Sequence, residues 1–159
     1  LFEEERVATC LEILKEADEK NVHIHLPDDS VIADKFDNNA TTKNCQSNQI
    51  TEGWMGLDIG ENAIKTFTSV LANSETILWN GPMGVFELST FENGTKSIAK
   101  AVSDATQNGA FSLIGGGDSS AAVKKFGYTQ KVSYVSTGGG ALLEYFEGKK
   151  LPGILAIEG

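Results

Sequence analysis

The chain has 159 residues, of which 40% are hydrophobic and 22% are charged, which is enough for one globular domain but not for two complete ones. Its formal net charge is −9, and such an acidic balance argues against binding to nucleic acid or to an anionic membrane surface, both of which need clustered Lys and Arg. No apolar run approaches the ~20 residues of a membrane span and no secretory signal is visible, so we expect a cytoplasmic protein.

The first third of the chain predicts a helix, two short strands and a long loop. Glutamates in the first turn and an apolar stripe through Val7, Leu11 and Leu14 predict the helix. The alternation in residues 22–26 predicts one strand, and residues 31–33 predict another after a Pro-Asp-Asp turn. Residues 34–51 are almost wholly polar, which is typical of a surface loop.

Several residues in this part of the chain could bind a metal or carry a modification. His23 and His25 would share one strand face, but no third ligand is evident, so we interpret them as surface residues. Cys10 and Cys45 show no disulfide framework and no metal spacing, and we interpret both as ordinary thiols. The segment Asn93-Gly94-Thr95 matches a glycosylation sequon, which without a signal peptide we attribute to chance.

The second half repeats one pattern, in which a β-rich run, a glycine turn and an amphipathic helix follow one another. The three units have strands at 76–79, 111–114 and 132–135 and helices at 91–107, 120–126 and 141–146. Strands that alternate with helices predict an α/β fold, with a parallel sheet covered on both faces and the glycine turns meeting at its carboxyl edge.

A fourth glycine-rich segment, residues 53–60, leads into a helix with Ile64, Phe67 and Leu71 on one face. It could be a further turn of the same kind at the carboxyl edge of the sheet. The alternative is a tight loop that packs Trp54.

The second of these units, residues 111–120, has the features of a phosphate site. An apolar strand runs into Gly115-Gly116-Gly117, whose backbone can approach an anion, and a helix N-terminus follows. Asp118 beside a phosphate indicates a Mg²⁺ ion between them. The alternative is a plain strand-to-helix turn in which Asp118 or Ser119 caps the helix. Neither a Walker-type motif nor the G-x-G-x-x-G fingerprint occurs.

The chain resembles the phosphoglycerate kinase family in a series of motifs that occur in the family's order and spacing. They are Leu26-Pro27-Asp28-Asp29 with Ala33-Asp34, Gly53-Trp54-Met55-Gly56-Leu57-Asp58, Trp79-Asn80-Gly81-Pro82-Met83-Gly84-Val85-Phe86-Glu87, Gly115-Gly116-Gly117-Asp118-Ser119, Val135-Ser136-Thr137-Gly138-Gly139-Gly140-Ala141 and Leu151-Pro152-Gly153. Two positions depart from the family pattern, because Asp29 stands where an apolar residue is expected and Ser119 where threonine is common.

The resemblance covers the whole chain but only the C-terminal part of that enzyme. It implies that residues 1–159 are the later portion of a C-terminal nucleotide-binding domain, with a Rossmann-like three-layer α/β/α parallel sheet, in a two-domain kinase. The N-terminal domain, which binds the phosphoglycerate, has no counterpart here. The resemblance further implies an intact protein that is a monomer.

The resemblance also implies where the adenosine part of a nucleotide binds. Gly56 and Leu57 would line the adenine pocket, with Asn80 and Pro82 near the base and the α-phosphate. Glu87 would accept hydrogen bonds from the ribose hydroxyls, which suits a side chain that only accepts when ionised.

At the phosphate end, the resemblance assigns the metal to Asp118 and the phosphates to neighbouring backbone and hydroxyl groups. The phosphate-binding residues would be Gly116, Gly117 and Ser119. The catalytic group would be the turn formed by Gly138, Gly139 and Gly140, which aims a helix N-terminus at the transferring phosphoryl.

The implied activity is a phosphotransferase reaction of glycolysis. A phosphoryl group passes reversibly between 1,3-bisphosphoglycerate and ADP·Mg²⁺, giving 3-phosphoglycerate and ATP. Helix termini contribute about 0.3–1 kcal/mol each, against the ~8–23 kcal/mol of an enzyme's rate enhancement, so we expect the isolated chain to be inactive. The alternative function is a non-catalytic module that binds ADP or ATP.

Overall fold

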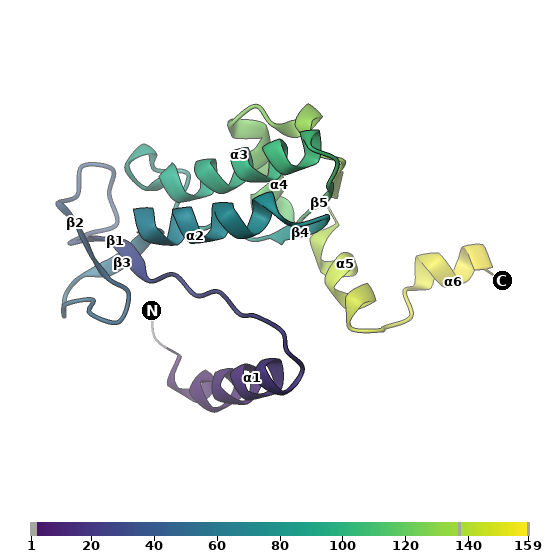
Figure 1. Cartoon of the computed structure of the whole chain (residues 1–159), viewed down its shortest axis with the longest axis horizontal. Coiled ribbons are helices and arrows are strands. Elements are labelled where there is room, and N and C mark those ends of the chain that lie inside the picture. The colour runs from purple at the N-terminus through teal and green to yellow at the C-terminus, as the bar shows by residue number, and fades with distance from the viewer. Residues whose placement is uncertain (1–2, 137, 159) are drawn as a thin grey trace.

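The computed structural model describes residues 3–136 and 138–158, and its strands form two separate three-stranded sheets (Figure 1). In the first sheet, β1 (Asp29–Ala33) lies between β2 (Thr42–Gln46) and β3 (Met55–Ile59), and both pairings are antiparallel. In the second sheet, β4 (Thr76–Asn80), β5 (Phe111–Gly115) and β6 (Tyr134–Ser136) are parallel and adjacent in that order.

The helices begin and end as follows. The α-helices are α1 (Val7–Glu19), α2 (Glu61–Ala72), α3 (Asn93–Gln107), α4 (Gly117–Lys125), α5 (Gly139–Phe146) and α6 (Pro152–Glu158), and short 3₁₀ turns span Glu4–Arg6, Ser89–Phe91 and Thr129–Lys131. Two predicted helices begin two or three residues earlier than the sequence pattern indicates, because Gly117 and Gly139 already belong to their first turns. None of the helices in the described residues is long and apolar enough to cross a membrane.

The predicted α/β architecture with a parallel sheet flanked by helices is confirmed. Side chains alternate across the strands, so that Ile77, Trp79 and Ile114 are buried on one face of the second sheet. Apolar residues of α2, α3 and α4 pack against that face in one hydrophobic core, which includes Ile98 and Val123. Burial of this helix layer fixes the orientation of the sheet and of the turns that leave its carboxyl edge.

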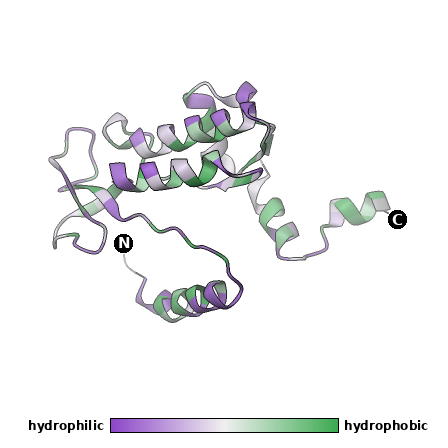
Figure 2. Ribbon diagram, in the orientation of Figure 1, coloured by the Kyte–Doolittle hydropathy of each residue, from purple (hydrophilic) through white to green (hydrophobic). Residues whose placement is uncertain are grey.

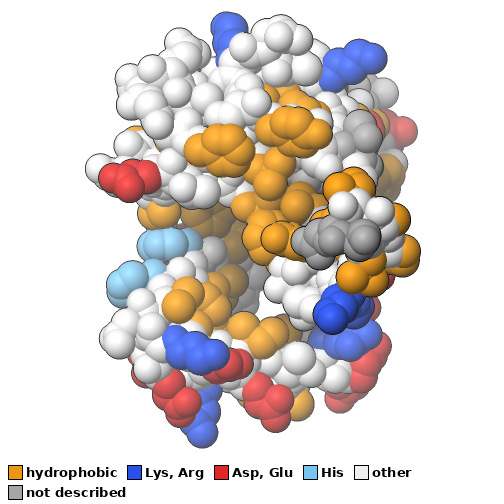
Figure 3. Space-filling view, turned by 90° about the vertical axis from the view of Figure 1, so that its right-hand side faces the viewer, with side chains coloured by type: hydrophobic (Ala, Val, Ile, Leu, Met, Phe, Trp, Pro, Cys, Tyr) orange, Lys and Arg blue, Asp and Glu red, His pale blue; other side chains and the backbone are white. Residues whose placement is uncertain are grey.

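The predicted cover on the second face of the parallel sheet is not found among the described residues, where that face remains exposed. Leu78, Phe111 and Tyr134 are 44%, 53% and 60% exposed, although Leu78 and Phe111 each sit on a strand beside a buried neighbour. Figure 3 shows hydrophobic side chains gathered across this side of the molecule, above a hollow. Helices α5 and α6 extend away from the sheet, and most of their length is hydrophobic (Figure 2).

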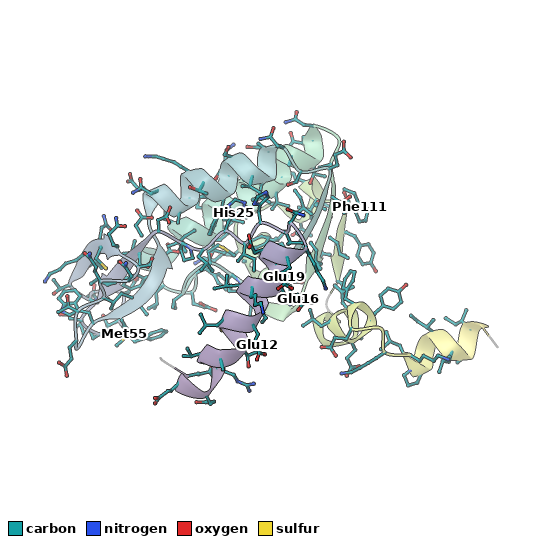
Figure 4. The ribbon with its side chains drawn as sticks, turned by 60° about the horizontal axis from the view of Figure 1, so that its bottom comes forward. Glu12, Glu16, Glu19, His25, Met55 and Phe111 are labelled. Atoms are coloured by element: carbon teal, nitrogen blue, oxygen red, sulfur yellow. The ribbon has the colours of Figure 1, made fainter. Side chains whose placement is uncertain are left out.

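The N-terminal helix is confirmed, but the predicted strand at residues 22–26 is wrong. None of the residues of α1 is buried. The segment after it is not a strand, because a strand requires a hydrogen-bonded neighbouring strand and residues 22–27 have none among the described residues. A cavity of about 250 Å³ lies between His25 and β4. His25 (Figure 4) lines that cavity together with Leu71 and Trp79.

His23 and His25 lie near each other on the segment that follows α1. The ring centres of His23 and His25 lie 6.5 Å apart, and no group of three or more metal-binding side chains occurs in the described part of the chain. Cys10 is exposed and Cys45 is half-buried, and both are free thiols.

The predicted loop at residues 34–51 contains a strand that the sequence did not indicate. Strand β2 is polar and mostly exposed, so it lacks the apolar alternation that marks a strand, and its pairing with β1 alone makes it an edge strand. The ammonium of Lys43 lies 4.1 Å from the centre of the Trp54 ring. This cation–π contact packs Trp54, which is half-buried, against the edge strand.

Candidate functional site

The glycine turns that follow β5 and β6 meet at the carboxyl edge of the parallel sheet. A Cβ atom on Gly139 would collide with Cα of Gly116 and would lie 2.7 Å from its backbone nitrogen, so only glycine allows this approach. Gly116 itself has a φ of +89°, and a Cβ there would lie 2.7 Å from Oδ1 of Asn80. The ends of β4 and β5 and the start of α5 therefore meet around Gly116.

Helices α4 and α5 begin side by side at this edge. The first turn of each helix leaves backbone N–H groups without acceptors inside the helix and carries a partial positive charge. The hydroxyl of Ser120 donates to the carbonyl of Gly116 at 2.7 Å and also lies 3.3 Å from the carbonyl of Ser136, which ties the two turns together. Gly117, Gly138 and Gly140 are exposed here, and an anion could reach the N–H groups. Thr137, in the same motif, lies outside the described residues.

Asp118 is exposed in the first turn of α4, where it forms no side-chain cap. The N-cap residue of this helix is Gly116, so the capping alternative does not account for Asp118. A single carboxylate suits a Mg²⁺ ion that shares its coordination with phosphate oxygens and water. The residues present thus fit a metal that is bound together with a phosphate ligand.

Ser119 is almost completely buried and faces the loop that follows β4. Its hydroxyl accepts a hydrogen bond from the N–H of Gly81 at 2.7 Å. This bond holds the start of that loop against α4. A direct contact between the Ser119 hydroxyl and a ligand stays a prediction.

A second depression, of about 310 Å³, lies beside this edge and brings together three of the predicted adenosine-binding residues. Gly56, Leu57 and Pro82 line it, together with Gly84 and Val85. Its walls come from β3, from the loop after β4, and from Pro27 and Ser30. The loop therefore connects the depression to the helix N-termini at Gly116.

Two other predicted residues do not line the depression. Asn80 is exposed at the end of β4, beside the glycine turns. Glu87 is exposed directly after Phe86, a buried residue whose carbonyl accepts a hydrogen bond from Nζ of Lys125.

Asp58, which the sequence analysis left without a role, is a buried carboxylate between β3 and α3. It accepts hydrogen bonds from the N–H groups of Ile59 at 2.9 Å and Gly94 at 2.8 Å. Burial raises the pKa of Asp58 to about 6, although the N–H donors of Gly94, Ile59 and Asn93 oppose this shift. The sequence signal was its place in the Gly53–Asp58 motif.

Thr95 is the other residue that the sequence analysis missed. Its side chain is fully buried, and Oγ1 accepts hydrogen bonds from the N–H groups of Met83 at 3.1 Å and Gly84 at 3.2 Å. The sequon that contains Thr95 was attributed to chance. No sequence signal pointed to a contact with the loop, because the partners lie 11 and 12 residues away on a different element.

The fold defines a parallel-sheet α/β protein with its glycine turns at one edge. The family model described as phosphoglycerate kinase matches residues 1–149. The chain therefore belongs to the phosphoglycerate kinase family.

Individual relatives agree with the family match. The chain is 54% identical to the phosphoglycerate kinase of Porphyromonas gingivalis over 100% of its own length and 38% of that protein. It is 49% identical to the cytosolic phosphoglycerate kinase of Nicotiana tabacum over 99% of its length and 39% of that protein. The solved structure of phosphoglycerate kinase from Coxiella burnetii matches 92% of the chain, with 41% identity and a TM-score of 0.87. The chain covers 38% of that structure, so it spans well under half of its relatives.

Proposed function

We propose that the intact protein that carries this chain is a phosphoglycerate kinase and that the chain supplies its nucleotide side. The reaction moves a phosphoryl group from the carboxyl oxygen of 1,3-bisphosphoglycerate to the terminal phosphate of ADP·Mg²⁺, giving 3-phosphoglycerate and ATP in glycolysis. The observation that carries this proposal is the meeting of Gly116 and Gly139, which brings two helix N-termini to one point beside a depression.

The depression is the proposed site of the adenine base. Gly56 offers no side chain and Leu57 an apolar one, so a flat ring can lie close to the backbone. Pro82 adds an apolar edge without an N–H donor. Asn80 is placed near the α-phosphate, and Glu87 is the proposed acceptor for the ribose hydroxyls.

The phosphates are proposed to bind at the starts of α4 and α5. Gly116, Gly117 and Ser119 contribute N–H and hydroxyl groups, and Asp118 holds the metal. When bound, Mg²⁺ neutralises charge on the phosphate oxygens. The turn of Gly138, Gly139 and Gly140 directs the N-terminus of α5, with about half a positive charge, at the transferring group.

The acyl-phosphate substrate is proposed to bind outside this chain. The chain spans 38% of its relative from Porphyromonas gingivalis, and its helix termini supply only about 0.3–1 kcal/mol each towards a transition state. The basic groups that clamp the phosphoryl are therefore assigned to other parts of the intact protein. We also propose a cytoplasmic monomer that binds neither nucleic acid nor membranes, for which the acidic charge and the cytosolic relative are the support.

Two measurements on the intact protein test the proposal. Calorimetry should detect binding of ADP in the presence of Mg²⁺, and a coupled assay with 3-phosphoglycerate, ATP and Mg²⁺ should detect turnover. Nucleotide binding without turnover would favour the alternative of a non-catalytic module. Absence of both would overturn the proposal.

A further inference from the structure

The loop of residues 81–85, which joins the two halves of the candidate site, has all of its backbone N–H groups occupied. Gly81 donates to Ser119 Oγ at 2.7 Å, and Val85 donates to the carbonyl of Leu57 at 2.8 Å. Met83 and Gly84 both donate to Oγ1 of Thr95. Pro82 has no N–H group. The shape of the loop is therefore set by the protein and not by a ligand.

Thr95 holds the centre of this loop from the first turn of α3. Its hydroxyl is one acceptor shared by two N–H donors, and no other side chain among the described residues binds Met83 or Gly84 through these groups. The neighbouring N–H of Gly94 is bound by Asp58 at 2.8 Å, so the start of α3 is itself fixed. The Thr95 hydroxyl is therefore held by its bonds to the loop and by the fixed start of the helix that carries it.

Close packing prevents the loop from finding another arrangement nearby. A Cβ atom on Gly84 would collide with Oδ1 of Asp58 and would lie 2.7 Å from the carbonyl oxygen of Leu57. A Cβ on Gly94 would also collide with the Asp58 carboxylate. These contacts restrict the loop to one conformation, and the Thr95 hydroxyl accepts the hydrogen bonds that stabilise this conformation.

We propose that Thr95 is a positioning residue for the nucleotide, which acts by holding Met83 and Gly84 so that Pro82 forms the wall of the depression. The proposal rests on the proposed function of that depression. Thr95 is fully buried and contacts the loop, not the ligand. Without its hydroxyl, the N–H groups of Met83 and Gly84 lose their partner, and the loop must rearrange before a nucleotide can bind.

The variants Thr95→Val and Thr95→Ser in the intact protein test this role. Thr95→Val keeps the shape but removes the acceptor, so the Kd and KM for Mg·ADP should rise about tenfold, as expected for lost hydrogen bonds. The kcat at saturating nucleotide and the KM for the phosphoglycerate substrate should change less than twofold. Thr95→Ser keeps the hydroxyl and should restore the nucleotide KM.

Thr106→Val is the matched control, because it makes the same substitution on the same helix. The Thr106 hydroxyl donates to the carbonyl of Val102 and lies 2.7 Å from the hydroxyl of Ser112, away from the loop. This variant should lower the melting temperature without changing the KM for nucleotide. If Thr95→Val does not fold, Thr95→Ala, which removes the hydroxyl together with the γ-methyl, replaces it in the same comparison.

Amide hydrogen exchange without nucleotide separates this inference from the proposed function. The N–H groups of Met83 and Gly84 should exchange faster in Thr95→Val than in wild type or Thr106→Val. Unchanged exchange at both residues, or a nucleotide KM equal to that of Thr106→Val, would overturn the role of Thr95. A wild-type protein that binds no nucleotide would instead overturn the proposed function, whatever the exchange rates.

Discussion

Asp58 is a buried carboxylate that connects β3, the start of α3 and the loop beside the depression. Burial raises the pKa of its carboxyl to about 6, because the N–H donors of Gly94, Ile59 and Asn93 offset only part of the lost solvation. The same carboxylate fixes the start of α3 and packs against Gly84 in the loop. The residue therefore joins the start of α3 to the loop beside the depression.

The free energy of unfolding should depend on pH through the titration of the Asp58 carboxyl. Its folded-state pKa of about 6 lies above its ordinary value of 3.8, so between these pH values the folded state binds more protons than the unfolded state. The contribution of Asp58 to the free energy of unfolding is therefore fully present below about pH 4 and is lost as the pH rises through about 6. Two pKa units correspond to at most about 3 kcal/mol.

Chemical denaturation of wild type and Asp58→Asn between pH 4 and pH 7 measures this effect. The difference in unfolding free energy between the two proteins should change with pH in this window, because only wild type titrates at position 58. Parallel pH profiles would show that Asp58 has an ordinary pKa in the folded protein.

Asp118 should affect turnover far more than stability. It is exposed and makes no cap, so Asp118→Asn in the intact protein should lower the unfolding free energy by less than about 1 kcal/mol, through the lost attraction to the helix dipole. Loss of a metal ligand should lower kcat on the order of 10²-fold or more. Thermal unfolding and the coupled assay measure the two effects. Mg²⁺-dependent turnover that stays undiminished would contradict the metal role.

At the scale of elements, the contact between α5 and the turn before α4 places both helix N-termini at the site. This contact depends on Gly139 having no side chain, because a Cβ atom there would collide with the backbone of Gly116. Backbone atoms cannot move aside as a flexible side chain can. A substitution there must separate the two elements.

Gly139→Ala should therefore destabilise the protein by about 1–3 kcal/mol, as overpacking does, and lower its melting temperature. Gly140→Ala is the control for stability, because a Cβ there has no heavy atom within 4 Å and alanine favours a helix. Differential scanning calorimetry of both variants makes the comparison. Equal melting temperatures would mean that α5 is not held against Gly116.

At the scale of the whole molecule, the described chain leaves large apolar surfaces uncovered. No residue of α1 is buried, and the second face of the parallel sheet exposes Leu78, Phe111 and Tyr134. Uncovered strand faces and edges of this kind favour association. The isolated chain should therefore self-associate, which light scattering after gel filtration measures.

The isolated chain should also lack turnover in the coupled assay with 3-phosphoglycerate, ATP and Mg²⁺, although it carries the proposed nucleotide site. The intact protein is the positive control. Turnover near the median of enzymes, about 10 s⁻¹, would show that the catalytic groups lie within these 159 residues.

The amino-acid sequence by itself determined the parallel sheet, because strand, glycine turn and helix repeat with periods that local geometry imposes. These patterns predicted the strands that end near Trp79, Ile114 and Val135, and the structure confirms them. The motifs predicted the family, which the family match confirms. Pairing partners were harder to predict. The polar strand β2 lacks the alternation of apolar and polar residues that marks a strand. Residues 22–26 have this alternation but do not pair with a neighbouring strand.

Only the tertiary structure decided what the individual polar side chains do. Asp29, for which the sequence analysis expected no such role, accepts hydrogen bonds from the N–H groups of Asn62 at 3.0 Å and Ala63 at 2.8 Å at the start of α2. Thr95 and Ser119 likewise bind a loop that lies 11 to 38 residues away. The sequence could not show such contacts, because a side-chain oxygen accepts any N–H that folding brings near, and local periodicity carries no record of distant partners.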